Sequence, residues 1–174
     1  YVDEKTNHMF LRVDSGEENI ERISDLTQEL LDQYELIVIS DYNKGYLLEE
    51  DIQFICENHP QVFIDTKKKI GDYCQQCVFI KINQYEYANS LDYISTHPWA
   101  RNKIITTLGN KGSSFKDKTF SVEKVEIKDL SGAGDTFMAA LAVEYLKSKD
   151  MEKSIVFANT CATKVVQMKG VNVI

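Results

Sequence analysis

Short apolar segments rich in β-branched residues recur along the chain, and most are followed by a longer stretch with the spacing of an amphipathic helix. A short run that is apolar throughout is typical of a strand buried on both faces, as in parallel sheets. Strands that alternate with helices predict a doubly wound α/β fold, in which a mostly parallel sheet has helices on both faces. The predicted strands are residues 35–40, 61–65, 78–82 and 103–108.

Apolar residues three and four positions apart predict the covering helices. The first begins after the capping-box spacing of Ser15 and Glu18 and extends to Tyr34. Segments on either side of Asp117 predict a β-hairpin, and the alternating segment 9–14 predicts a further strand. The other predicted helices are residues 48–58, 84–95, a segment that opens at 131–135, and 151–168. Gly170, just after the last of these, is a natural C-terminal stop. The predicted hairpin strands are residues 113–116 and 119–122.

The length of 174 residues suits one domain, so we expect residues 1–174 to form a single α/β domain. Ligands of such folds bind in the crevice at the carboxyl ends of the strands. Four residues fall at those ends in the predicted sheet, namely Asp41, Asp65, Asn83 and Gly109. We therefore expect the functional site at this edge.

Composition and charge narrow the class of protein. With 43% hydrophobic and 27% charged residues, the chain matches soluble globular proteins, which argues against disorder and fibrous repeats. The net charge of −7 argues against nucleic acid as the main partner, although the basic run 67–69 can hold an anion such as phosphate. The longest apolar run, residues 36–39, is far shorter than the roughly 20 residues of a membrane helix, and no secretory signal opens the chain. We expect a cytoplasmic protein without membrane contact.

Four cysteines include Cys74 and Cys77, which have the C-x-x-C spacing. A zinc site needs about four ligands, and no second C-x-x-C or H-x-x-x-H follows in the sequence. A redox C-x-x-C is expected at a helix start after a strand. We interpret the cysteines as ordinary reduced thiols of a cytoplasmic protein and assign no role to Cys74 and Cys77.

Small residues and one acid mark the start of the helix that opens at 131–135. Glycine and alanine there let an anion approach the amides of the first turn, where the helix dipole favours negative charge. A carboxylate beside a bound phosphoryl group can accept the proton of an attacking hydroxyl, as a general base. Alternatively, Asp135 only compensates the helix dipole in a turn packed through small residues. The residue types alone leave both interpretations open.

The segment S-G-A-G-D-T-F at 131–137 resembles the GAGD signature of the ribokinase (PfkB-type) carbohydrate kinases. The resemblance implies that Asp135 is the catalytic base. It also implies that the amides of Gly132, Ala133 and Gly134 form the anion hole for the transferred phosphoryl group. The fold that it implies is ribokinase-like, in agreement with the strand and helix order.

Further segments match motifs of that family in the expected order. Asn83 and Glu86 match N-x-x-E, which holds the magnesium and phosphate region largely through waters, as suits Mg²⁺; a helix cap explains the spacing equally. Residues 107–112 resemble T-x-G-x-x-G, which implies nucleotide binding by Thr107, Gly109 and Gly112. Asn159 lies in a segment similar to the adenine-side helix, where packing through small residues is the alternative. The cofactors implied are ATP and Mg²⁺, and the acceptor is a sugar hydroxyl.

Residues 40–45 (S-D-Y-N-K-G) resemble the S-D-Y-x-K-G stretch of the heptose 7-phosphate kinases, found alone or as the kinase half of the ADP-heptose synthesis enzyme. Residues 11–14 resemble L-R-x-D of that group, and residues 63–67 resemble its I-D-P-K segment with threonine in place of proline. The resemblance implies a phosphate or substrate loop with Asp41 and Lys44. It also implies that Lys67 neutralises nucleotide phosphate charge, while solvated surface lysines are the alternative for both lysines.

The expected function is ATP-dependent phosphorylation of a sugar phosphate, most specifically a heptose 7-phosphate at its anomeric position, in ADP-heptose and lipopolysaccharide precursor synthesis. Another PfkB-type sugar kinase and a non-catalytic nucleotide-binding or assembly module are the alternatives. A nicotinamide-dependent oxidoreductase is disfavoured because no G-x-G-x-x-G follows an early strand.

The resemblance covers nearly the whole chain but only the second part of the family's domain. We therefore expect a C-terminal portion of the kinase domain, without the N-terminal strands, much of the sugar pocket and the lid. Dimers formed through the lid are common in that family. The resemblance therefore implies that the full-length protein forms a homodimer.

Overall fold

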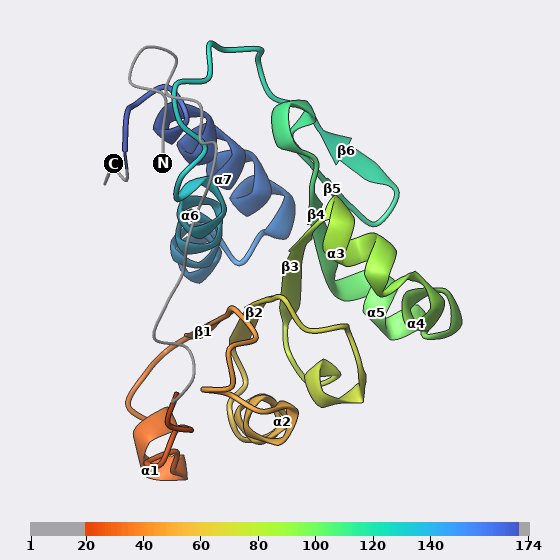
Figure 1. The fold of residues 1–174 in the computed structure, drawn as a ribbon, viewed down its shortest axis with the longest axis vertical. Coiled ribbons are helices and arrows are strands. Elements are labelled where there is room, and N and C mark those ends of the chain that lie inside the picture. The colour runs from red at the N-terminus through yellow and green to blue at the C-terminus, as the bar shows by residue number, and fades with distance from the viewer. Residues whose placement is uncertain (1–19, 171–174) are drawn as a thin grey trace.

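A computed structural model describes residues 20–170 of the chain and contains one six-stranded sheet (Figure 1). The strands lie side by side in sequence order. Strands β1 to β4 are parallel, and β5 and β6 continue the sheet as an antiparallel hairpin. The four predicted parallel strands and the hairpin are confirmed. The strands are β1 (Ile37–Asp41), β2 (Val62–Thr66), β3 (Phe79–Asn83), β4 (Ile104–Thr107), β5 (Ser113–Phe115) and β6 (Lys118–Phe120).

Helices cover both faces of the sheet, which confirms the doubly wound arrangement (Figure 1). One face carries α2 (Glu49–Asn58), the 3-10 turn η2 (Asp72–Cys74), and the short helices α3 (Gln84–Asn89), α4 (Leu91–Thr96) and α5 (Pro98–Lys103). The opposite face carries α6 (Ala133–Ser148) and α7 (Met151–Val165), which pack against each other. The remaining elements are α1 (Gln28–Leu31) and the 3-10 turn η3 (Gly109–Lys111).

The alternation of side chains along each strand divides the core into two clusters. In β2, Val62 and Ile64 join the cluster under α2, whereas Phe63 between them joins the cluster under α6 and α7. Phe63 contacts Phe79 and Tyr145, with ring centroids 5.8 and 5.4 Å away. Because both faces are covered, all five residues of β2 are buried.

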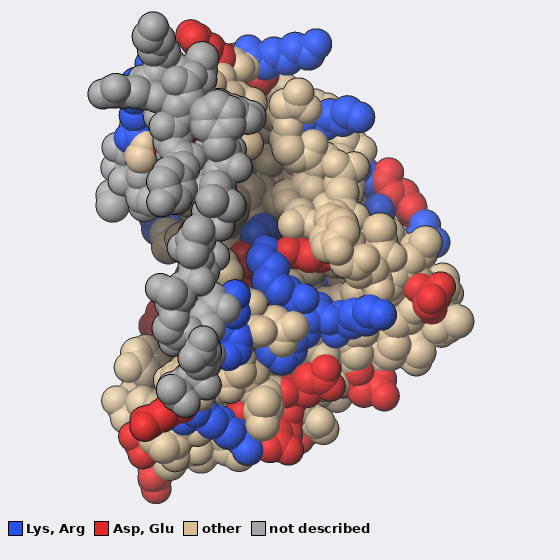
Figure 2. All heavy atoms as spheres, viewed as in Figure 1, with Lys and Arg blue, Asp and Glu red and all other residues tan. Residues whose placement is uncertain are grey.

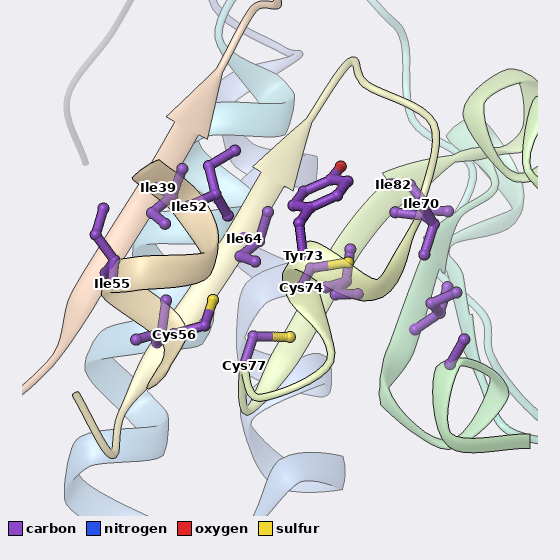
Figure 3. Packing of buried hydrophobic residues seen from close by; sticks show 14 of the residues in the cluster. Ile39, Ile52, Ile55, Cys56, Ile64, Ile70, Tyr73, Cys74, Cys77 and Ile82 are labelled. Atoms are coloured by element: carbon purple, nitrogen blue, oxygen red, sulfur yellow. The ribbon is translucent and has the colours of Figure 1, made fainter. Parts of the chain in front are cut away.

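Three cysteines lie buried in the cluster under α2, as Figure 3 shows for Cys56, Cys74 and Cys77. Burial raises the pKa of Cys56 to about 12 and that of Cys74 to about 11, so both remain protonated at neutral pH. All four cysteines of the chain are free. Within residues 20–170, no group of three or more His, Cys, Asp or Glu side chains could hold a metal ion.

The first predicted helix is wrong over much of its length. Only α1 is helical, and residues 20–27 have no regular structure. Tertiary pairing holds this segment in another conformation, because Ile23 N–H donates to Tyr46 O at 3.0 Å and Arg22 Nη2 lies 2.7 Å from Asp51 Oδ1. The predicted strand at 9–14 and the capping-box residues lie outside the described residues.

The other differences are local. The predicted helix 84–95 is divided at Ser90, whose hydroxyl oxygen accepts the Ile70 N–H at 3.0 Å, and α5 is an additional helix that begins at Pro98. The hairpin turn lies one residue earlier than predicted, with Lys116 at a φ of 55°. The last helix ends at Val165 instead of 168. Among the described residues, no helix is long and apolar enough to cross a bilayer.

Candidate phosphoryl-transfer site

The N-terminal turn of α6 is shaped by glycine. Gly132 is the N-cap residue and has a φ of 73°, in the left-handed region that glycine adopts without steric cost. Because Gly132 has no side chain, no cap side chain occupies this end of the helix. Asp129 fixes the approach to the turn by accepting the N–H of Ser131 at 2.9 Å and that of Gly170 at 3.0 Å, and these hydrogen bonds lower the pKa of Asp129.

A charged cavity of about 180 Å³ lies between this turn and the carboxyl ends of β1, β2 and β3. Asp135 of α6 is exposed and faces it. The hydroxyl of Tyr42 donates to the two carboxylate oxygens of Asp135, at 3.2 and 3.4 Å. We call this space the Asp135 cavity, and its lining residues are Ser40, Asp41, Tyr42, Asp65, Lys67, Lys81, Gly134 and Asp135.

A buried ion pair forms part of this lining. Lys81 Nζ on β3 lies 2.6 Å from Asp65 Oδ2 on β2, and the two residues are only 5% and 7% exposed. Burial raises the pKa of Asp65, while the Lys81 ammonium opposes the shift. Sequence reasoning placed Asp65 at this edge but assigned no role to Lys81. The available signal was a charged residue within the otherwise apolar run F-I-K-I of a buried strand.

Asp41 is the last residue of β1, and its carboxylate holds the loop that follows in place. Its Oδ1 accepts the N–H of Asn43 at 2.9 Å. Its Oδ2 accepts the hydroxyl of Thr66 at 2.8 Å and lies 2.7 Å from Lys68 Nζ. These contacts fix the loop and thereby place Tyr42 beside α6. Lys44 is exposed on the same loop and is not among the residues that line the Asp135 cavity.

Asn83 and Glu86 form a reciprocal capping box at the start of α3. Asn83 Oδ1 accepts the Glu86 N–H at 2.9 Å, and Glu86 Oε2 accepts the Asn83 N–H at 2.7 Å. Glu86 Oε1 accepts from Asn83 Nδ2 at 2.9 Å and also pairs with Lys67. With its carboxylate engaged by these donors, Glu86 fits Mg²⁺ only through intervening water. Lys67 connects this pair to the Asp135 cavity, which it lines.

A second cavity, of about 330 Å³, lies on the other side of the α6 turn. Its walls come from η3, α6, α7 and the irregular segment 122–130, and most of the lining side chains are apolar. Four residues predicted to bind nucleotide line it, namely Thr107, Gly109, Gly112 and Asn159. Mostly apolar walls with a few polar groups suit a flat organic ring. We call this space the apolar cavity.

The two cavities meet at the start of α6, because Gly134 lines both of them. Asn159, on α7, also has a structural contact, since its Nδ2 donates to Phe120 O at 3.0 Å. The wall formed by residues 122–127 was not identified from the sequence, because a segment without regular structure carries no periodic signal. A larger cavity of about 580 Å³ beside α3, α4 and α5 contains none of the predicted site residues.

Charged side chains are unevenly distributed over the surface. Figure 2 shows Lys and Arg side chains gathered near the middle of the face that it draws, with acidic side chains around them. The whole chain has a net charge of −7. A local concentration of basic groups attracts anions even on an acidic protein.

Comparison with known proteins identifies relatives over most of the chain. The model of the pfkB family of carbohydrate kinases matches residues 49–173. The bifunctional protein HldE of Nitratiruptor sp. is 30% identical over 95% of this chain and 40% of its own length. HldE of Helicobacter pylori J99 is 28% identical over 84% of this chain and 36% of its own length. The chain therefore spans about two fifths of the length of these curated relatives.

Solved structures share the fold. A ribokinase from Thermotoga maritima has a TM-score of 0.65 and 24% identity, over 84% of this chain and 57% of that protein. A putative ribokinase from Agrobacterium tumefaciens has a TM-score of 0.68 and 14% identity, over 87% of this chain and 55% of that protein. The ribokinase-like fold predicted from the sequence is thus confirmed.

Proposed function

Because the chain belongs to the pfkB family of carbohydrate kinases, we propose that it carries the phosphoryl-transfer site of an ATP-dependent sugar kinase. The observation that carries the proposal is the position of the α6 turn. An apolar cavity lies on one side of Gly134 and a charged cavity with an exposed carboxylate lies on the other. A phosphoryl group held at this turn would be close to both a nucleotide and an acceptor.

In the proposed reaction, an acceptor hydroxyl oxygen in the Asp135 cavity attacks the γ-phosphorus of ATP in line with the bond to the β-phosphate oxygen. A new P–O bond to the sugar forms, the bond to the β-phosphate oxygen breaks, and ADP leaves. The hydroxyl proton passes to the Asp135 carboxylate. The Tyr42 hydroxyl, which donates to this carboxylate, supports the role by holding Asp135 in a defined orientation at the cavity.

The nucleotide is assigned to the apolar cavity, with the base between the irregular segment and α7. Thr107, Gly109 and Gly112 lie where the phosphates would pass toward Gly134. The amides of Gly132, Ala133 and Gly134 would then stabilise the transferred group together with the helix dipole. Asn159 lines this cavity but already binds Phe120, so its proposed contribution is to hold the wall in place.

When Mg²⁺ is bound with the nucleotide, it neutralises negative charge on the phosphates. Asn83 and Glu86 would hold it through water, as their capping box requires. Lys67 pairs with Glu86 and lines the Asp135 cavity. It would therefore neutralise phosphate charge either beside Glu86 or in the Asp135 cavity.

The proposed acceptor is a heptose 7-phosphate, phosphorylated at its anomeric hydroxyl in ADP-heptose and lipopolysaccharide precursor synthesis in the cytoplasm. Support comes from the HldE relatives and from the S-D-Y-N-K-G loop. A homodimer of the full-length protein belongs to the same proposal and rests on the family resemblance.

The acceptor is tested by measuring ADP release from Mg²⁺-ATP by the full-length protein with heptose 7-phosphate, fructose 6-phosphate and ribose. We expect release with heptose 7-phosphate at a kcat/KM at least about tenfold above that of the other sugars. Equal or higher activity on fructose 6-phosphate or ribose would overturn the acceptor assignment. The absence of ADP release with every sugar would overturn the kinase proposal.

A further inference from the structure

We propose that Lys81 contacts the phosphoryl group in transit, as a cation held beneath the anion-binding turn of α6. This inference rests on the proposed kinase function and adds a residue that neither the sequence motifs nor the comparisons assign. Lys81 is on β3, on the side of the sheet that faces α6, and is only 5% exposed. It lines the Asp135 cavity together with Gly134.

The distance between Lys81 and the turn is the first argument. A Cβ atom built on Gly134 would lie 3.0 Å from Lys81 Nζ, tighter than nine in ten real Cβ contacts. The ammonium group therefore lies directly against the backbone of the first turn of α6. Since Gly134 lines both cavities, a phosphoryl group that moves from the nucleotide to an acceptor at Asp135 passes this point. A glycine at 134 keeps the ammonium and the passing group within reach of each other.

The electrostatics of the pair are the second argument. The N-terminus of α6 has partial positive charge, so a buried ammonium beside it is repelled unless an anion is present. Asp65, with Oδ2 at 2.6 Å, supplies one negative charge. A buried ion pair is weak evidence for stability, because well-packed apolar residues often serve a core equally well. A cation and a helix N-terminus that converge on one cavity are better explained by an anion that both stabilise.

Lys67 is the other lysine in this cavity and is a poorer candidate for the same contact. Its side chain is 40% exposed and is paired with Glu86 at the start of α3. Lys81 is almost fully buried, and its only titratable neighbour at ion-pair distance among the described residues is Asp65. The group at the α6 turn that faces the transferred phosphoryl is therefore Lys81.

A purely structural role would have Lys81 serve only to neutralise Asp65. The two roles predict different behaviour of the two partners. If the pair is structural, Lys81→Met and Asp65→Asn each break it and have similar effects on nucleotide binding. If Lys81 contacts the transferred group, Lys81→Met weakens binding of a triphosphate, whereas Asp65→Asn retains it because the cation remains.

The test is calorimetric titration of the full-length protein with Mg²⁺ and either ADP or the β,γ-imido analogue of ATP. For Lys81→Met we expect the triphosphate affinity to fall roughly 10- to 100-fold and the ADP affinity to change less than about threefold, as for one lost charge-assisted hydrogen bond to the γ-phosphate. Asp65→Asn should keep the triphosphate affinity within about threefold of the unaltered chain. The double variant Asp65→Asn, Lys81→Met removes both charges of this pair, so it gives the effect of losing Lys81 without an unpaired partner.

Equal losses for ADP and the triphosphate, or similar losses in Lys81→Met and Asp65→Asn, would overturn the role of Lys81 and leave the kinase proposal intact. Unchanged triphosphate affinity in the double variant would do the same. If the unaltered chain binds neither nucleotide, the nucleotide site itself is wrong, and the two proposals fail together.

Discussion

The hydroxyl of Tyr42 donates to the carboxylate of Asp135 at 3.2 Å and connects the loop after β1 to the first turn of α6. The two residues are 93 positions apart in the chain. Partial burial and the neighbouring Asp135 carboxylate raise the pKa of Tyr42, so its hydroxyl remains a donor at neutral pH. The contact therefore holds an otherwise exposed carboxylate in a defined orientation over the Asp135 cavity.

Tyr42→Phe should lower kcat of the full-length protein about 2- to 10-fold, which corresponds to the loss of one ordinary hydrogen bond. Tyr42 is 55% exposed, so the melting temperature should not change. Tyr46→Phe is the matched control, because Tyr46 is 52% exposed in the same region and is not among the residues that line the Asp135 cavity. A loss of nucleotide affinity equal to the loss of kcat would show that Tyr42 does not act through Asp135.

Gly132→Ala should destabilise the fold by about 1–2 kcal/mol, because an alanine at a φ of 73° is in the strained left-handed region. It should also weaken nucleotide binding, since the turn that it distorts separates the two cavities. Urea unfolding and calorimetric titration measure the two effects. Gly45→Ala is the matched control, because Gly45 also has a positive φ, of 96°, but lines neither cavity. Similar losses of nucleotide affinity in both variants would contradict the anion-hole assignment.

Arg22→Ala should destabilise the chain at neutral pH and have little effect in strong acid. Arg22 donates to both carboxylate oxygens of Asp51, and these hydrogen bonds hold the pKa of Asp51 below its ordinary value of 3.8. A carboxyl group whose pKa is lower in the folded state contributes stability above its unfolded pKa. That contribution is lost as the pH falls through the folded pKa.

Urea unfolding at neutral pH and at about pH 2 measures this difference. Arg101→Ala is the control, because it breaks an ion pair with Asp117 in which both side chains are mostly exposed, at 64% and 84%, so little change is expected. A difference between Arg22→Ala and the unaltered chain that persists unchanged in acid would refute the role of the Asp51 contact.

Ile64→Ala should lower the free energy of unfolding by about 2–5 kcal/mol, because Ile64 is fully buried between β2 and α2 and truncation leaves a cavity. Val38→Ala on the neighbouring strand β1 should cost less than about 0.5 kcal/mol, since Val38 is 42% exposed. Denaturant midpoints of both variants check the prediction. Equal losses would contradict the burial of Ile64 in the core and the exposed position of Val38.

Strand positions were predictable because a doubly covered parallel sheet requires continuous apolar runs, and residues 62–64 form such a run. The helix predicted to reach Tyr34 shows where local periodicity fails. Residues 20–27 have helical spacing, but the contact of Arg22 with Asp51 and that of Ile23 with Tyr46 hold them in another conformation. Those contacts join segments far apart in sequence and carry no periodic signal. The same applies to the break at Ser90, which depends on a hydrogen bond from Ile70.

Residues of the site differ in how well sequence could identify them. Asp135 and the glycines before it are contiguous in the sequence. The sequence alone therefore predicts that they lie together in one turn. Lys81 was not identified, because its significance depends on the distance to Gly134, which lies on another element. Asp41 was expected to act on substrate or phosphate, but its carboxylate is occupied by the hydrogen bonds that build the loop.

The most direct test of the account is the comparison of kcat and nucleotide affinity for Asp135→Asn in the full-length protein. Asparagine keeps the size of the side chain but is no general base, so kcat should fall about 10²- to 10⁴-fold while the affinity for Mg²⁺-ATP stays nearly unchanged. Asp117→Asn, at an exposed position in the β5–β6 turn, serves as the control and should keep full activity. A variant Asp135→Asn with the kcat of the unaltered protein would contradict the assignment of Asp135 as the base.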